Sequence, residues 1–161
     1  MTPHSLAFYA DVITTGKLLC LEPSATPDEV TAVLGTDCAE NSLDTTTMWR
    51  DYGMVEFHWL RSAPGHPWEG HHFTLHVHRL SYWGGSSVNK TLRDRYGRFA
   101  RRTDFTKLRR ILERRGVPLI QVPQPADGID EFRQPASGVS VMSERGPRQA
   151  SDLYTIHSPM A

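Results

Sequence analysis

Apolar and polar residues alternate in the middle of the first half of the chain. Residues 55–59 place apolar side chains at every second position, with Glu56 and His58 between them. Residues 72–78 repeat this alternation, with apolar side chains at 73, 75 and 77. A period of two is typical of strands that bury one face. We therefore predict strands on both sides of a tight turn at Gly53, within residues 46–60, and a third strand at 72–78. Pairing of position 57 with 75, 55 with 77 and 59 with 73 would bring the apolar side chains onto one face.

Two other segments have the apolar periodicity and the end signals of helices. The first begins at Thr26, which can cap the helix, while Pro27 suits the first helical position and Glu29 completes a capping box. Gly35 can end this helix in a left-handed conformation. The second is expected from about residue 104 to 115, before Gly116. Its predicted buried stripe consists of Phe105, Leu108, Ile111 and Leu112. A shorter helix is expected at residues 6–13.

The second helix is followed by further strand candidates at residues 119–122, 131–134, 138–143 and 153–157. The order of helix and strands thus resembles that of the first passage, although alternating strands also resemble one another by coincidence. We predict an α+β fold of two related helix-plus-antiparallel-sheet halves, with the helices packed on one sheet face. Residues 1–161 would form a single domain, with a first half at 1–80, a connecting segment at 81–103 and a second half at 104–161.

Charge is unevenly distributed along this chain of 161 residues, whose net charge is zero. Residues 1–60 hold two basic and nine acidic side chains, a balance of −7, whereas residues 90–115 hold eleven basic and three acidic ones, a balance of +8. Overall neutrality disfavours bulk binding to polyanions.

Two cysteines are too few for a disulfide scaffold. Because neither an export signal nor a membrane-spanning run is evident, we expect a cytoplasmic protein that does not act at a membrane.

Residues 26–35 read T-x-x-x-V-x-x-x-L-G, and Tyr52-Gly53 and Val55-Glu56-Phe57 follow as a turn and a strand. This series resembles small actinobacterial immunity-type proteins of polymorphic toxin systems. It is similar also to the helix–sheet unit of small outer-membrane assembly lipoproteins and of secreted β-lactamase-inhibitor proteins, the latter a tandem of two such units. The resemblance covers residues 25–80 and, more loosely, 104–158, and Thr36-Asp37 replaces the usual small residue and proline. It implies a binding protein whose exposed sheet face or loops dock onto another protein.

Histidines gather on the predicted outer sheet face, since six of the eight lie within 21 residues. His76 and His78 are two positions apart on one strand, with Glu56 and His58 on its neighbour, and such a set could hold zinc tetrahedrally. A metal-dependent enzyme using this strand is therefore one alternative. The other interpretation is an exposed polar face with a Glu56–His76 cross-strand pair. Since the chain contains none of the common hydrolase, nucleotide-binding or metalloprotease motifs, we expect a protein that is not an enzyme and has no metal or cofactor.

Trp68, Tyr82 and Trp83 lie in or beside loops that flank the predicted sheet face. They are either anchors of a protein interface or rings folded back over the sheet edge. The basic segment at residues 90–115 could contact phosphates, which makes a small nucleic-acid-binding regulator a further alternative. A solvated helix face that balances the acidic first half explains the same charges, so we do not expect nucleic acid as the partner.

Together these patterns predict an immunity-type inhibitor that binds and occludes a cognate bacterial toxin protein. The candidate partner-binding residues are Glu56, His58, Trp68, His72, His76, His78, Tyr82 and Trp83.

Overall fold

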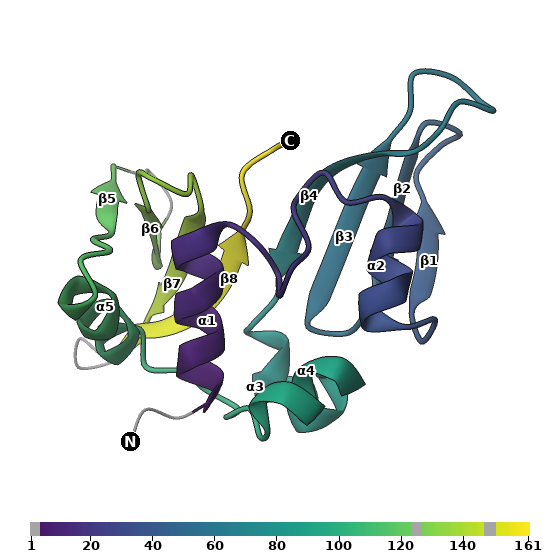
Figure 1. Ribbon diagram of the computed structural model, residues 1–161. Helices are drawn as coiled ribbons and strands as arrows, with labels where there is room; N and C mark the ends of the chain where they lie inside the picture. Colours follow the sequence, from purple (N-terminus) through teal and green to yellow (C-terminus); the bar gives the residue numbers. More distant parts are fainter. Residues whose placement is uncertain (1–3, 124–126, 147–150) are drawn as a thin grey trace.

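Eight antiparallel strands form one sheet, made of two four-stranded meanders that meet in its middle (Figure 1). The computed structural model describes residues 4–123, 127–146 and 151–161. The strand order is β1-β2-β3-β4-β8-β7-β6-β5, so the two meanders face each other through their last strands. With its helices packed on the sheet, the molecule has the α+β architecture predicted from the sequence.

The first meander follows helix α2, whose start has the predicted capping box. The Thr26 hydroxyl accepts a hydrogen bond from the Glu29 backbone N–H, and the Glu29 carboxylate accepts one from the Thr26 N–H. Val30 and Leu34 turn toward the sheet and are buried. The elements of this half are α2 (Pro27–Leu34), β1 (Ala39–Ser42), β2 (Thr47–Asp51), β3 (Val55–Leu60) and β4 (Glu69–Leu75). Strand β1 was not predicted, because all of its residues are exposed and no apolar pattern marks it.

The register of β3 on β4 differs from the predicted one by two residues. Phe57 pairs with Phe73 and Val55 with Leu75, and an irregularity after His58 places Trp59 opposite Gly70. Before this irregularity the shift is two residues, which leaves the side chains on their expected faces, since faces alternate with a period of two. The alternation therefore predicted the buried set correctly, while the length of the loop between the strands decided the pairing.

The second meander follows helix α5, which begins at the cap residue Asp104, whose carboxylate accepts a hydrogen bond from the Lys107 N–H. Phe105, Leu108 and Leu112 are buried as predicted, and Ile111 is partly buried. The elements of this half are α5 (Phe105–Arg114), β5 (Ile120–Val122), β6 (Ile129–Arg133), β7 (Ser140–Arg145) and β8 (Ser151–His157). All four strands lie within two residues of their predicted positions.

The two meanders meet at a short seam between β4 and β8. Two residue pairs join these strands, Thr74 with His157 and Leu75 with Ile156. The chain after β8 then runs beside β4, where the Ser158 N–H donates to the Phe73 carbonyl and the Ala161 N–H to the His71 carbonyl.

The segment between the halves is helical rather than an extended linker. It contains α3 (Arg79–Trp83), the 3-10 turn η1 (Gly84–Ser87) and α4 (Lys90–Tyr96). Leu80 and Leu92 are fully buried there, although too few apolar residues mark these short helices for the sequence to indicate them. Helix α1 (His4–Thr15) packs against α5 and α4. Residues 1–80 therefore include a helix that lies with the second half of the molecule.

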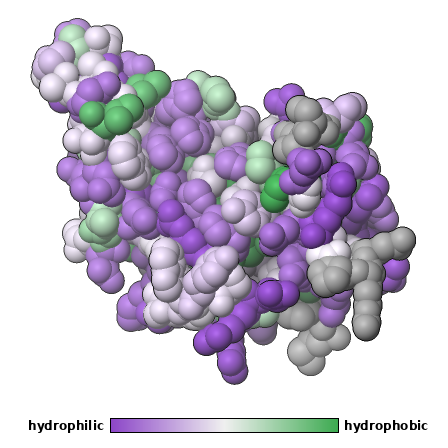
Figure 2. Space-filling model, turned by 180° about the vertical axis from the view of Figure 1, so that it is seen from behind, coloured by the Kyte–Doolittle hydropathy of each residue, from purple (hydrophilic) through white to green (hydrophobic). Residues whose placement is uncertain are grey.

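Helices α1, α2 and α5 all cover the same face of the sheet (Figure 1). The core between them and the sheet includes Phe57, Trp59, Phe73 and Leu75, all without exposed surface. The Trp59 indole N–H donates to the Ala25 carbonyl over 2.8 Å, which satisfies its polar atom inside the core. The opposite side of the sheet, here called the helix-free face, is mainly hydrophilic (Figure 2). Among the described helices, none is long and apolar enough to span a membrane.

Candidate partner-binding face

A stack of three rings crosses the helix-free face from β2 to β4. Trp49 pairs with His58 and His58 with His72 in the strand register. The Trp49 and His58 rings are 6.1 Å apart at 19°, and the His58 and His72 rings are 4.3 Å apart at 6°. The register places Trp49 opposite His58, so its ring lies on the helix-free face.

Burial lowers the pKa of His72 to about 4, and the neighbouring His58 and His71 rings act in the same direction. Its Nδ1 atom lies 2.6 Å from Nδ1 of His71, so one ring donates and the other accepts. His72 is therefore a neutral, oriented imidazole at physiological pH.

Glu56 is the centre of a buried charge network below this stack. One carboxylate oxygen accepts a hydrogen bond from Arg79 over 2.5 Å. The other lies 3.1 Å from Nε2 of His76 and 3.5 Å from Nε2 of His58. The contacts with His58, His76 and Arg79 hold the pKa of Glu56 well below its usual range against the opposing effect of burial. Arg79 also donates to Asp51, so its guanidinium is fixed between two carboxylates.

His78 takes a different direction from the other histidines. Its ring stacks on Tyr154 of β8 at 4.3 Å and 15°. Of the four residues considered for a zinc site, Glu56, His58 and His76 thus lie together. His78 is apart from them, against Tyr154. Across the described part of the chain, no group of three or more histidine, cysteine, aspartate or glutamate side chains has an arrangement suited to a metal ion.

Tyr82 and Trp83 are the exposed aromatics of helix α3, with 78% and 61% of their surface accessible. Trp83 adjoins the Glu56 network, because the Arg79 guanidinium lies 5.9 Å from its ring. Trp68 lies elsewhere. It is half-buried under the Arg61 guanidinium and lines hollows near the N-terminus of α2, together with Met48.

The structure thus brings together most of the residues singled out from the sequence. Arg79 and Tyr154, which connect them, were not identified, because neither has a sequence signal that distinguishes it from other surface residues. The members on or beside the helix-free face are Glu56, His58, His72, His76, His78, Tyr82 and Trp83.

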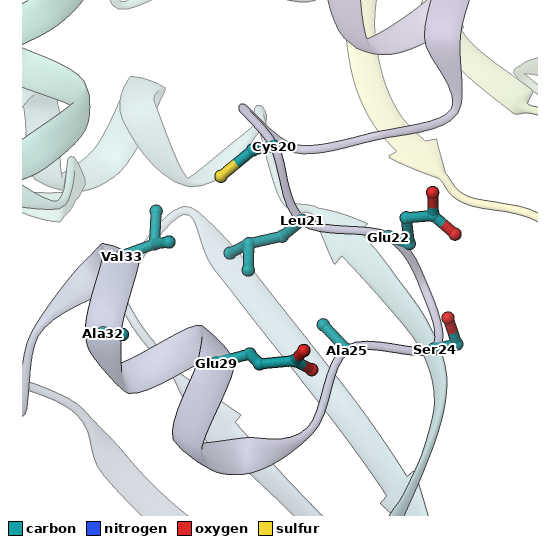
Figure 3. Close-up of a pocket in the computed structure, with 8 residues that line it drawn as sticks. All are labelled: Cys20, Leu21, Glu22, Ser24, Ala25, Glu29, Ala32 and Val33. Atoms are coloured by element: carbon teal, nitrogen blue, oxygen red, sulfur yellow. The ribbon is translucent and has the colours of Figure 1, made fainter.

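A separate pocket of about 520 Å³ lies between α2 and the turn that precedes it (Figure 3). Leu21, Ala25 and Val33 form its apolar wall, with Cys20 at one end. Its Glu29 carboxylate is bound by the helix cap, and Glu22 pairs with Lys17 over 2.7 Å. The polar groups of this pocket therefore serve local structure, and none of the predicted site residues lines it.

Comparisons of the chain with models of protein families, with curated proteins and with solved structures gave no match.

Proposed function

We propose that the protein is an immunity-type inhibitor that binds and occludes a cognate bacterial toxin in the cytoplasm. The observation that supports it best is the exposed pair Tyr82 and Trp83 of α3, of which Trp83 lies beside Arg79 of the Glu56 network. Tyrosine, tryptophan and arginine are the residues most enriched where protein interfaces gain their binding energy.

The residues beside this pair favour binding, because hydrogen bonds hold them in place before a partner arrives. Arg79, beside Trp83, is fixed by Asp51, Glu56 and the Gly53 carbonyl. A surface that is rigid before association loses less conformational entropy when the partner binds. The Glu56 carboxylate accepts a hydrogen bond from Arg79 and lies against His58 and His76, which favours a structural role for it over acid–base catalysis.

The proposed function predicts a toxin gene beside that of this protein, and co-expression of the two tests it. We expect restored growth of the host and a purified one-to-one complex. Tyr82→Ala combined with Trp83→Ala should weaken binding by about thirtyfold or more, which corresponds to roughly 2 kcal/mol. Leu43→Ala is the matched control, because Leu43 is also 78% exposed but lies on the β1–β2 turn.

A neighbouring toxin that is neither bound nor inhibited would exclude the proposed function. Equal loss of binding in the Leu43→Ala control would show that the aromatic pair of α3 is not the anchor.

A further inference from the structure

A pocket of about 290 Å³ lies on the helix-free face where the two meanders meet. We call it the seam pocket. His72 of β4 forms one side, and β6, β7, β8 and the chain after β8 supply the rest. It lies beside the place where β4 pairs with β8 and where the chain after β8 continues along β4, with Ser158 bonded to Phe73 and Ala161 to His71. Both halves of the molecule are therefore needed to form it.

The seam pocket is the continuation of the ring stack. His58 covers one face of the His72 imidazole in an almost parallel stack. Because β8 lies on the other side of β4 from β3, the second face of this imidazole is directed toward β8. The residues that line the pocket opposite His72 come from that side. A planar group inside the pocket would thus become the fourth ring of the stack.

The remaining lining combines apolar side chains, which suit an aromatic ring, with the polar or charged side chains of Glu131, Arg133, Ser140 and His157. Met142, Met160 and Pro159 provide apolar surface, and methionine sulfur makes favourable contacts with aromatic rings. Ser140 and Arg133 place polar groups at the same pocket, where a phenol hydroxyl or an indole N–H could be satisfied. The volume is at the lower limit of small-molecule sites, roughly 300–1,000 Å³, and so suits a single side chain rather than an extended ligand.

We propose that the seam pocket receives one aromatic side chain of the protein partner, stacked on His72. This inference rests on the proposed function and adds a second anchor point to it. In contrast to Tyr82 and Trp83, which reach out from the protein, the seam pocket accepts a ring from the partner. The neutral state of His72 supports the stacking, because a ring without charge need not lose ionic hydration when it is covered.

The test uses p-cresol and indole as probes, since they are the side chains of tyrosine and tryptophan. Titration of the full chain, followed by NMR, should shift the methyl signals of Met142 and Met160 and the ring signals of His72 in a saturable way. His72→Ala should weaken the apparent affinity at least tenfold. Ser140→Trp should abolish binding by filling the pocket, and Leu43→Ala, on the β1–β2 turn, should leave it unchanged.

Shifts that do not saturate, or that persist in Ser140→Trp, would overturn the inference. Stronger binding of adenosine or methylguanidinium than of the two aromatic probes would also overturn it, by assigning the pocket to a nucleobase or an arginine.

Failure of the inference can be told apart from failure of the proposed function. If Ser140→Trp still inhibits the toxin with full affinity, the function stands and the seam pocket is not part of the interface. If the probes bind as expected but the toxin is not inhibited, the inference that the seam pocket binds an aromatic ring is retained and the proposed function is rejected.

Discussion

Glu56 combines a largely buried side chain, 12% exposed, with a full negative charge, and its neighbours explain how both are possible. Its side chain is within reach of three cationic or potentially cationic groups, those of Arg79, His76 and His58. The contact of Glu56 with His76 was one interpretation of the sequence, and the two side chains lie 3.1 Å apart. They are not a cross-strand pair, because Glu56 pairs with Thr74 and His76 follows the end of β4. Arg79 could not be predicted as the third member, because it reaches the network from the start of α3.

Replacement of Glu56 by glutamine should therefore cost about 1–3 kcal/mol of unfolding free energy. The amide keeps the shape of the side chain but leaves Arg79 with Asp51 as its remaining carboxylate partner. Urea denaturation measures the loss. Glu40→Gln is the control, since Glu40 is largely exposed and pairs with Arg50 at the surface, where an ion pair contributes about 0–1 kcal/mol. Equal effects of the two changes would contradict a buried network.

The histidines of the sheet make the free energy of unfolding depend on pH. Burial lowers the pKa of His72, His78 and His157 below the ordinary value of 6.5, in the case of His72 to about 4. Between these pKa values the unfolded chain binds more protons than the folded chain, so the free energy of unfolding rises with pH. The contribution is fully present above pH 6.5 and is lost as pH falls toward 4.

We expect the unfolding free energy to fall by roughly 1–2 kcal/mol between pH 7 and pH 5, after allowance for solvent screening. His72→Gln should reduce this slope, as measured by urea denaturation at a series of pH values. His66→Gln is the control, because His66 lies exposed in the loop between β3 and β4. A flat profile, or an identical slope in both variants, would show that His72 is not held neutral by burial.

At the scale of elements, the helices and strands that the sequence predicts are those with a periodic pattern of buried residues. The stripe of α5 and the alternation of β3 follow directly from a face that is buried along its whole length. Helices α3 and α4 bury one large apolar side chain each, Leu80 and Leu92, and such short elements carry no periodic signal. The sequence did not indicate the ring stack either, because the stack depends on the register of three strands.

Removal of core side chains should confirm which elements carry the stability. Phe57→Ala and Leu108→Ala should each lower the unfolding free energy by about 2–5 kcal/mol, because both side chains are fully buried. Thermal or urea unfolding measures the effect. Lys107→Ala on the exposed side of α5 should change it by less than about 0.5 kcal/mol. Unchanged stability in the two core variants would be incompatible with this packing.

At the scale of the whole molecule, acidic residues from other parts of the chain neutralise part of the basic segment at residues 90–115. Arg115 pairs with Asp11 of α1, and Arg102 with Asp152 of β8. Arg109 of α5 is half-buried over the Phe132 ring at 5.2 Å. The basic segment is thus partly engaged in holding α5 and the connecting helices to the rest of the protein.

We therefore expect mixed DNA or RNA to bind weakly at physiological salt. A mobility-shift titration at two salt concentrations measures this, because each phosphate contact adds to the salt dependence of the affinity. The double variant Arg110→Glu, Arg114→Glu is preferable to a change at Arg109, since both residues are exposed. Sub-micromolar binding that falls steeply with salt and is lost in this variant would favour a nucleic-acid protein instead.

The short seam between β4 and β8 has a consequence for the order of folding. Each meander pairs strands that are neighbours in sequence, whereas the seam joins Thr74 to His157, 83 residues apart. Closing so long a loop costs more entropy than closing a hairpin. In pulse-labelling hydrogen exchange, the amides of His78 and Ser158, which bond across the seam, should become protected after those inside β3 and β7. The seam pocket would then form in the last step, and only a molecule with both meanders in place could engage a partner there.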